Sequence, residues 1–168
     1  MRIFIVGPMA SGKSTIGKRL AQKLNLQFID IDKEIEDRAG TDIPWIFEVE
    51  GEKGFRKREE KVLEESIKKS NVVISTGAGI VLSKSNRDLM IRSGKVIYLK
   101  ASLEIQLKRT QNDRSRPLLM DGNKEEVLKK LKKEREPIYE EISDLKIHQE
   151  NKKFKQVVEE ISNKLNNE

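Results

Sequence analysis

Cysteine is absent from the 168 residues of this sequence. That absence excludes disulfides, thiolate metal sites and cysteine nucleophiles, and it is typical of proteins that work in a reducing cytosol. The sequence also lacks an apolar stretch long enough to cross a bilayer, and its apolar start at residues 3–6 leads straight into a glycine-containing loop. We therefore expect a cytoplasmic protein with no membrane contact and no secretory leader.

Internal repeats, low-complexity linkers and long basic blocks are missing as well. A chain of this length is usually one domain, so we expect a single domain over residues 1–168. The formal net charge is +6, but the lysines are interspersed with glutamates on the faces of predicted helices. This pattern favours a solvated surface with an anion-binding cleft over a nucleic-acid-binding patch. The single histidine, His148, lies far from every motif and is given no role.

What the sequence does contain is a phosphate-binding loop near its start. Residues 7–14 read Gly-Pro-Met-Ala-Ser-Gly-Lys-Ser, which matches the pattern G-x-x-x-x-G-K-[ST]. The loop lies between an apolar segment at 2–6 and a segment at 13–24 whose apolar residues recur at helical spacing. In such a loop, backbone N–H groups and a helix N-terminus surround phosphates, the lysine adds a charge, and the serine hydroxyl can bind Mg²⁺. The residues expected around the nucleotide are Gly7, Ala10, Ser11, Gly12, Lys13, Ser14 and Thr15.

Short apolar segments alternate with amphipathic ones along the whole chain. The pattern predicts strands at residues 2–6, 27–29, 72–75, 96–99 and 146–148. It predicts helices at residues 13–24, 33–39, 44–50, 55–69, 84–93, 103–110, 124–134 and 154–165, with helix ends at Gly40, Gly51 and Gly94. This alternation is typical of a three-layer α/β/α fold, in which helices cover both faces of a parallel sheet. Ligands of such sheets bind beyond the C-terminal ends of the strands.

Two aspartates follow the second predicted strand. Residues two apart at a strand end point the same way, so Asp30 and Asp32 can both face one cleft. One can support Mg²⁺ and the other can accept a proton from a hydroxyl group. Equally, Asp32 can simply cap the helix predicted to start at residue 33.

Arginines and a small-residue loop provide candidate anion sites. Arg56 and Glu59 lie on one helical face, which predicts either an arginine fork held by a carboxylate or an ordinary surface ion pair. The loop of Gly77, Ala78 and Gly79 either lets a ligand approach its N–H groups or is a plain turn. Arg135 is expected to end a helix just before Pro137, where a solvated cation is also favoured.

The segment 107–119 is basic, then polar, and is followed by a proline and leucines, which is typical of a flexible loop that closes over phosphates. Arg114 in this segment is equally explained as an incidental charge. The aromatic residues Trp45, Phe47 and Phe55 are expected in the core, with a wall of the substrate site as the alternative.

Together these motifs resemble shikimate kinases over residues 1 to about 140. The matching features are the phosphate loop, Asp30-x-Asp32, the stretch from Ile46-Phe47 through Gly51-Glu52 to Phe55-Arg56, the loop 77–79, Arg116-Pro117-Leu118 and Arg135-x-Pro137-x-Tyr139. Their order and spacing are more specific than the phosphate loop alone. The resemblance implies ATP-dependent phosphorylation of the 3-hydroxyl of shikimate, in aromatic amino acid biosynthesis. It also implies a sheet of strand order 2-3-1-4-5, a substrate region at about 33–61 and a mobile lid at about 111–123.

The resemblance further implies a role for each matching residue. Lys13 and Ser14 would hold phosphates and Mg²⁺, Asp30 would support the metal, and Asp32 would meet the substrate hydroxyls as the candidate base. Arg56, Arg135 and the main chain of Gly77, Ala78 and Gly79 would bind the substrate carboxylate. Arg116 would reach from the lid to the phosphates, and Arg109 would stack on adenine. We expect a small-molecule substrate, no nucleic-acid partner and a monomer.

One residue departs from the family pattern, and several other protein classes remain open. Shikimate kinases usually carry three glycines where this chain has Ala78 in the middle, which would be strained if the position required a positive φ.

Other small P-loop kinases, acting on gluconate or nucleoside monophosphates, are the alternative function. A GTPase is disfavoured because no Asn-Lys-x-Asp motif occurs. A nucleic-acid-binding protein would show a steep salt dependence.

Overall fold

The computed structural model describes residues 1–119 and 122–167. The strands are β1 (Arg2–Val6), β2 (Gln27–Asp30), β3 (Val72–Ser75), β4 (Lys95–Lys100) and β5 (Leu145–His148). The helices are α1 (Lys13–Leu24), α2 (Ile31–Ala39), α3 (Ile43–Ser66), α4 (Lys84–Ser93), α5 (Leu103–Thr110), α6 (Lys124–Ile142) and α7 (Phe154–Asn166), with 3₁₀ turns η1 (Ile80–Leu82) and η2 (Pro117–Leu119).

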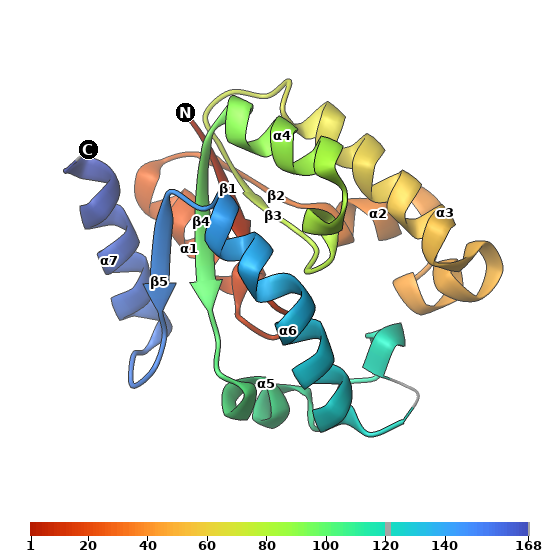
Figure 1. Cartoon of the computed structure of the whole chain (residues 1–168). Helices are drawn as coiled ribbons and strands as arrows, with labels where there is room; N and C mark the ends of the chain where they lie inside the picture. The colour runs from red at the N-terminus through yellow and green to blue at the C-terminus, as the bar shows by residue number, and fades with distance from the viewer. Residues whose placement is uncertain (120–121, 168) are drawn as a thin grey trace.

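The strands form one parallel sheet in the order β2-β3-β1-β4-β5, which confirms the predicted fold class and strand order (Figure 1). The first strand is central: Ile3 is paired with Val73 on one side and with Lys95 on the other. Residues 3–6 are completely buried, because helices cover the sheet on both faces.

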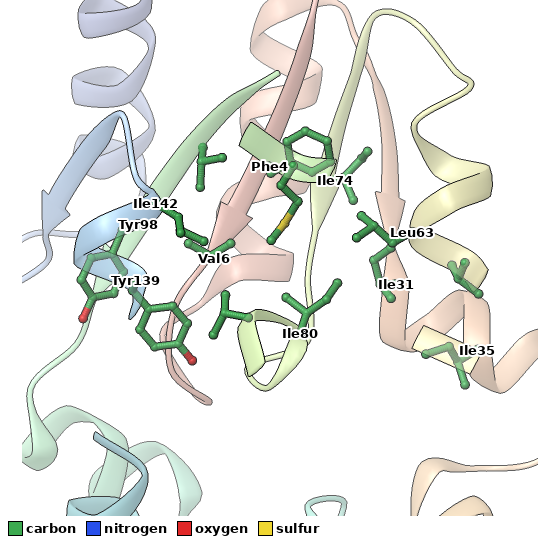
Figure 2. Close-up of a cluster of buried hydrophobic side chains, with 14 of the residues drawn as sticks. Phe4, Val6, Ile31, Ile35, Leu63, Ile74, Ile80, Tyr98, Tyr139 and Ile142 are labelled. Atoms are coloured by element: carbon green, nitrogen blue, oxygen red, sulfur yellow. The ribbon is translucent and has the colours of Figure 1, made fainter. Parts of the chain in front are cut away.

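Alternate residues of β1 enter two separate cores. Phe4 and Val6 pack with residues of α3, α4 and α6, whereas Ile3 and Ile5 pack with residues of α1 and α7. Figure 2 shows the first of these cores, where Phe4 and Val6 lie among side chains from the neighbouring strands and helices. In Figure 1, α4 and α6 lie across one face of the sheet. One core lies on each face of the sheet, so helices, sheet and helices form the three layers that the sequence pattern predicted.

The predicted strands agree with the structure to within one residue, but two predicted helix bounds were wrong and a third prediction was only partly right. First, α2 begins two residues early, at Ile31, because Asp30 rather than Asp32 is its N-cap. Second, α6 continues through Pro137 to Ile142. A proline inside a helix removes one backbone hydrogen bond, but the extra turns bury Tyr139 and Ile142 against the sheet, which offsets that loss.

Third, the segments 44–50 and 55–69 both lie in α3, which is interrupted at Gly51 by a non-helical conformation (φ 70°, ψ 178°). Gly51 therefore ends a first helical segment as predicted, but the second segment follows it directly and ends at Ser66 rather than at residue 69. Of the three glycines predicted to end helices, Gly40 has the expected left-handed conformation at the end of α2. Gly94 does end α4, but its backbone is extended. A Cβ atom at Gly94 would lie 2.4 Å from the Arg2 carbonyl oxygen, so close packing against β1 explains this glycine.

The C-terminal ends of the strands meet at one edge of the sheet. The phosphate loop follows β1 at this edge, α2 begins there after β2, and the loop of residues 77–79 follows β3. In Figure 1 the arrowheads point toward this edge, and α5 and η2 lie beyond it. None of the helices described here combines the length and apolar character that crossing a membrane requires.

Candidate active site

The phosphate loop needs unusual backbone conformations at several positions. Gly7 has φ 151° and Gly12 has φ 84°, and Ala10 between them also has a positive φ of 61°. A Cβ atom at Gly7 would lie 2.6 Å from the Leu99 carbonyl oxygen, and one at Gly12 would lie 3.2 Å from the Phe154 ring. These glycines therefore serve both the turn and the close approach of neighbouring chain segments.

Lys13, the first residue of α1, is buried against this loop. Its ammonium group donates to the carbonyl oxygens of Gly7 (3.0 Å) and Pro8 (2.9 Å). Its pKa is lowered to about 8, chiefly by burial and next by the Arg116 guanidinium, whereas Asp32 and Asp30 act in the opposite direction. The loop carbonyls thus hold the ammonium group in place.

Ser14 and Asp30 form the candidate metal-binding pair. The Ser14 hydroxyl donates a short hydrogen bond to the Asp30 carboxylate, whose Oδ1 also accepts from the Lys33 backbone N–H at 3.1 Å. Asp30 is thus the cap of α2, and the alternative role of Asp32 as a cap was wrong. A hydroxyl and a carboxylate are hard oxygen ligands of the kind Mg²⁺ prefers. Among the described residues no group of three acidic, histidine or cysteine side chains could hold a metal alone, so phosphates and water would complete such a site.

Asp32 lies in the first turn of α2 and is partly buried. Within the described part of the chain its Oδ1 atom is buried without a hydrogen-bond partner. Its pKa is raised to about 6, chiefly by burial and next by the Asp30 charge, although Lys13, Arg116 and Arg56 act against the shift. A carboxylate of raised pKa with a free oxygen atom is suited to accept a proton near neutral pH.

Arg56, which is half-buried, pairs with the fully buried Glu59, so the alternative of a surface ion pair was wrong. Glu59 is completely buried, and its Oε2 accepts from Arg56 Nη1 at 3.0 Å. Burial raises the pKa of Glu59 to about 7, with the Arg56 charge acting against this shift. A second carboxylate, Glu52, accepts from Arg56 Nη2 at 3.2 Å. The arginine is therefore held on two sides before any ligand arrives.

The glycines of the loop after β3 lie against the ends of charged side chains. A Cβ atom at Gly79 would lie 2.3 Å from Arg56 Nη2. One at Gly77 would lie 2.5 Å from Glu59 Oε1 and 2.9 Å from Asp32 Oδ1. Ala78 between them does not have a positive φ, so the strain considered for this position does not arise. Its carbonyl oxygen accepts a hydrogen bond from the Tyr139 hydroxyl.

Arg135 enters the same region from α6. Its side chain is 4% exposed, and its Nε atom is buried without a partner among the described residues. The interpretation of Arg135 as a solvated cation was therefore wrong. The continuation of α6 beyond Pro137 explains the difference, since Arg135 lies within the helix rather than at its exposed end.

The described part of the predicted lid packs against the phosphate loop and α6. Leu119 packs against Met9 of the phosphate loop and Leu128 of α6, and Arg116 Nε donates to Asp113 Oδ2 at 2.8 Å. Residues 120 and 121 of the predicted lid lie outside the described residues. The mobility of this segment stays a prediction.

Two adjoining cavities are formed by these elements. The phosphate-loop cavity, about 1060 Å³, is lined by Ala10, Gly12, Lys13, Ser14, Thr15, Asp30, Asp32, Lys33, Glu36, Thr76, Arg109, Arg116 and Phe154. The arginine cavity, about 490 Å³, is lined by Met9, Asp32, Ile43, Phe47, Phe55, Arg56, Glu59, Gly77, Ala78, Gly79, Ser115, Arg116, Pro117, Leu118 and Arg135. Asp32 and Arg116 line both cavities, so they mark the boundary between them.

Two residues near the site, Gln149 and Phe154, were not singled out by the sequence. The Gln149 amide is buried and donates to the carbonyl oxygens of Ser11 (2.8 Å) and Lys100 (2.9 Å), which ties the β5–α7 loop to the phosphate loop. Phe154 lies beside Arg109, whose guanidinium is 5.0 Å from the ring centroid and donates to the Ala10 carbonyl oxygen. Neither residue belongs to a sequence motif, so no local signal could have found them.

The three aromatic residues of α3 have different environments. Phe55 is buried and Phe47 packs against it, with ring centroids 4.9 Å apart, and both line the arginine cavity. Trp45 is 54% exposed, so its expected place in the core was wrong. The exposed His148 was given no role, and it lies in neither cavity.

A family model described as shikimate kinase matches residues 9–166 of this chain. The chain belongs to the shikimate kinase family. A relative from Yersinia enterocolitica, Shikimate kinase 1, is 51% identical over 164 residues, covering 97% of this chain and 95% of the relative. The solved structure of shikimate kinase from Acinetobacter baumannii in complex with shikimate has a TM-score of 0.95 at 41% identity, covering 98% of this chain and 92% of that one.

A gluconokinase from Sinorhizobium meliloti resembles the chain less closely, with a TM-score of 0.61 at 17% identity over 95% of this chain. At that identity the likeness concerns the fold alone. Shikimate kinases are ATP-using kinases, so family membership places the chain among enzymes that bind ATP.

Proposed function

We propose that this enzyme transfers the γ-phosphoryl group of ATP to the 3-hydroxyl of shikimate, giving shikimate 3-phosphate and ADP in aromatic amino acid biosynthesis. The observation that carries the proposal is the boundary between the two cavities. A carboxylate, Asp32, and an arginine, Arg116, border both the phosphate loop and a pocket with two further arginines. A phosphoryl donor on one side and an anionic hydroxy acid on the other would meet at this boundary.

The arginine cavity is suited to an acid with hydroxyl groups. Arg56 and Arg135 supply charged donors for a carboxylate, and the main chain of Gly77, Ala78 and Gly79 lies beside them. Asp32 Oδ1 has no protein partner in the described part of the chain and is available to a substrate hydroxyl. The shikimate bound in the Acinetobacter baumannii relative supports this choice of substrate.

The phosphate-loop cavity is suited to the triphosphate of ATP with Mg²⁺. Lys13 would contact the phosphates, whose oxygens are stronger acceptors than the two carbonyls that now hold its ammonium group. Ser14 would hold Mg²⁺, supported by Asp30, and the cation would neutralise charge on the phosphates. Arg109 would stack on adenine beside Phe154.

In the transfer step, the substrate hydroxyl oxygen bonds to the γ-phosphorus as the bond to the oxygen bridging the β- and γ-phosphates breaks. The hydroxyl proton passes to Asp32, and the leaving oxygen remains on ADP. Arg116 stabilises the charge of the phosphoryl group in transit. The protein thus contributes mainly positioning and charge stabilisation, as is general for phosphoryl transfer.

The remaining expectations from the sequence are part of the same proposal. The chain acts as one P-loop kinase domain over residues 1–168, with a substrate region at about 33–61 and a mobile lid at about 111–123. It works in the cytoplasm as a monomer on a small molecule, without nucleic-acid or membrane partners.

The test is an ADP-release assay with shikimate, gluconate and a panel of nucleoside monophosphates as acceptors. We expect turnover with shikimate that exceeds turnover with every other acceptor by at least about 10³-fold, since an acceptor of another shape cannot pair the arginines and Asp32 at the same time. Mass spectrometry of the product identifies the phosphorylated compound. Equal or faster turnover with gluconate or a nucleotide would contradict the proposal.

A further inference from the structure

A carboxylate inside the lid segment holds the arginine that borders both cavities. Asp113 Oδ2 accepts from Arg116 Nε at 2.8 Å. The other oxygen, Oδ1, accepts from the Ser115 backbone N–H at 2.8 Å and from the Ser115 hydroxyl. The backbone N–H of Asp113 donates to the Thr110 carbonyl oxygen at the end of α5. The turn that carries Arg116 is thus linked to a helix through Asp113.

The surroundings of Arg116 explain why it needs such a partner. Its charge faces Lys13, whose pKa it lowers, and Arg56 and Arg135 line the same cavity. Like charges in one cleft repel each other, so an unrestrained arginine would swing toward solvent when no ligand is bound. Within the described residues, Arg116 makes its hydrogen bond through Nε, which leaves its two Nη groups for a ligand.

We propose that Asp113 is a positioning residue for phosphoryl transfer. It fixes Arg116 at Nε, so that the Nη groups are directed at the boundary between the phosphate-loop cavity and the arginine cavity. The inference rests on the proposed function, in which Arg116 contacts the transferred phosphoryl group. Asp113 itself lines neither cavity and acts only through the arginine.

The experiment is a double-mutant cycle with Asp113→Ala and Arg116→Ala, in which kcat and both KM values are measured for all four enzymes. Arg116→Ala is expected to lower kcat on the order of 10³-fold, as loss of a phosphoryl-contacting arginine does. Asp113→Ala is expected to lower kcat about three- to tenfold, the range for removing one partly exposed partner of a charged pair. Both KM values should stay within about twofold. In the Arg116→Ala background, Asp113→Ala should change kcat by less than about twofold.

A neighbouring variant serves as the control for lid charge. Arg114→Ala removes an exposed lid cation that lines neither cavity. It should retain wild-type kcat within about twofold, because exposed substitutions away from such contacts have small effects. Thermal unfolding of each variant checks that the fold is intact.

The possible outcomes separate the inference from the function on which it rests. An equal loss from Asp113→Ala in both backgrounds would mean a general structural effect and would overturn the inference. The inference is also overturned if Asp113→Ala retains the wild-type kcat while Arg116→Ala lowers it. If Arg116→Ala itself keeps wild-type kcat, the assignment of Arg116 is wrong, and the inference is wrong with it. Absence of shikimate turnover in the wild-type enzyme would instead refute the proposed function.

Discussion

Replacing Asp32 with asparagine should remove activity and, at the same time, stabilise the fold. The pKa of Asp32 is raised from 3.8 to about 6, chiefly because burial disfavours its charged form. Each pKa unit corresponds to about 1.4 kcal/mol, so ionised Asp32 destabilises the folded state by up to about 3 kcal/mol. Asparagine has a similar shape without the charge, and it avoids this penalty.

The pH dependence of this effect has a definite sign. Between pH 3.8 and about 6 the folded protein binds the Asp32 proton more tightly than the unfolded chain does. The stability of the wild type therefore falls as pH rises through this window, and the whole penalty is present above it. Asp32→Asn should gain about 1–3 kcal/mol in unfolding free energy at pH 8, and this gain should disappear below about pH 4. Urea unfolding at both pH values measures it.

The same substitution should lower kcat by about 10²–10⁴-fold, since it removes the acceptor for the hydroxyl proton. Asparagine can still hydrogen-bond a hydroxyl, so the KM for shikimate should change less. In the wild type, kcat/KM should fall as pH drops through about 6, where Asp32 becomes protonated, and the variant should lack this limb. A fully active Asp32→Asn enzyme would refute the role of Asp32 as a base and leave substrate positioning as its function.

Three further predictions concern the residues around Asp32. Asp30→Asn should leave stability nearly unchanged, because asparagine caps a helix about as well as aspartate. The variant should need a higher Mg²⁺ concentration for activity, and full activity at limiting Mg²⁺ would exclude the metal role. Lys13→Ala should abolish transfer in a protein that still unfolds cooperatively, and near wild-type turnover would contradict the phosphate-loop assignment. Arg56→Ala and Arg135→Ala should each raise the KM for shikimate about ten- to a hundredfold and the KM for ATP far less, since each removes a charge-assisted hydrogen bond of about 1.5–3 kcal/mol. Initial-rate measurements with each substrate varied decide this, and a rise in the KM for ATP alone would place that arginine on the nucleotide side.

Much of the fold was available from the sequence because its signals are local. The phosphate loop is a contiguous pattern with a fixed geometry, and Lys13 is aligned with it by the helix that begins there. Strands and helices carry apolar periods of different length, so their positions were predicted to within a residue or two in most cases. The order of the strands in the sheet could not be predicted in this way, because apolar periodicity does not show which strands are neighbours. That order was predicted from the resemblance to a family.

The candidate site depended on tertiary structure wherever burial or distance decided a residue's role. A sequence cannot distinguish a surface ion pair from the pair of Arg56 and Glu59, because Glu59 is buried beside Gly77, which is remote in the chain. Continuation of α6 past Pro137 is likewise decided by the sheet against which its last turns pack, and that continuation buries Arg135. The sequence by itself determined which chemical groups are present and in what order. Only packing of the whole chain decided which of them are desolvated and which meet at one point.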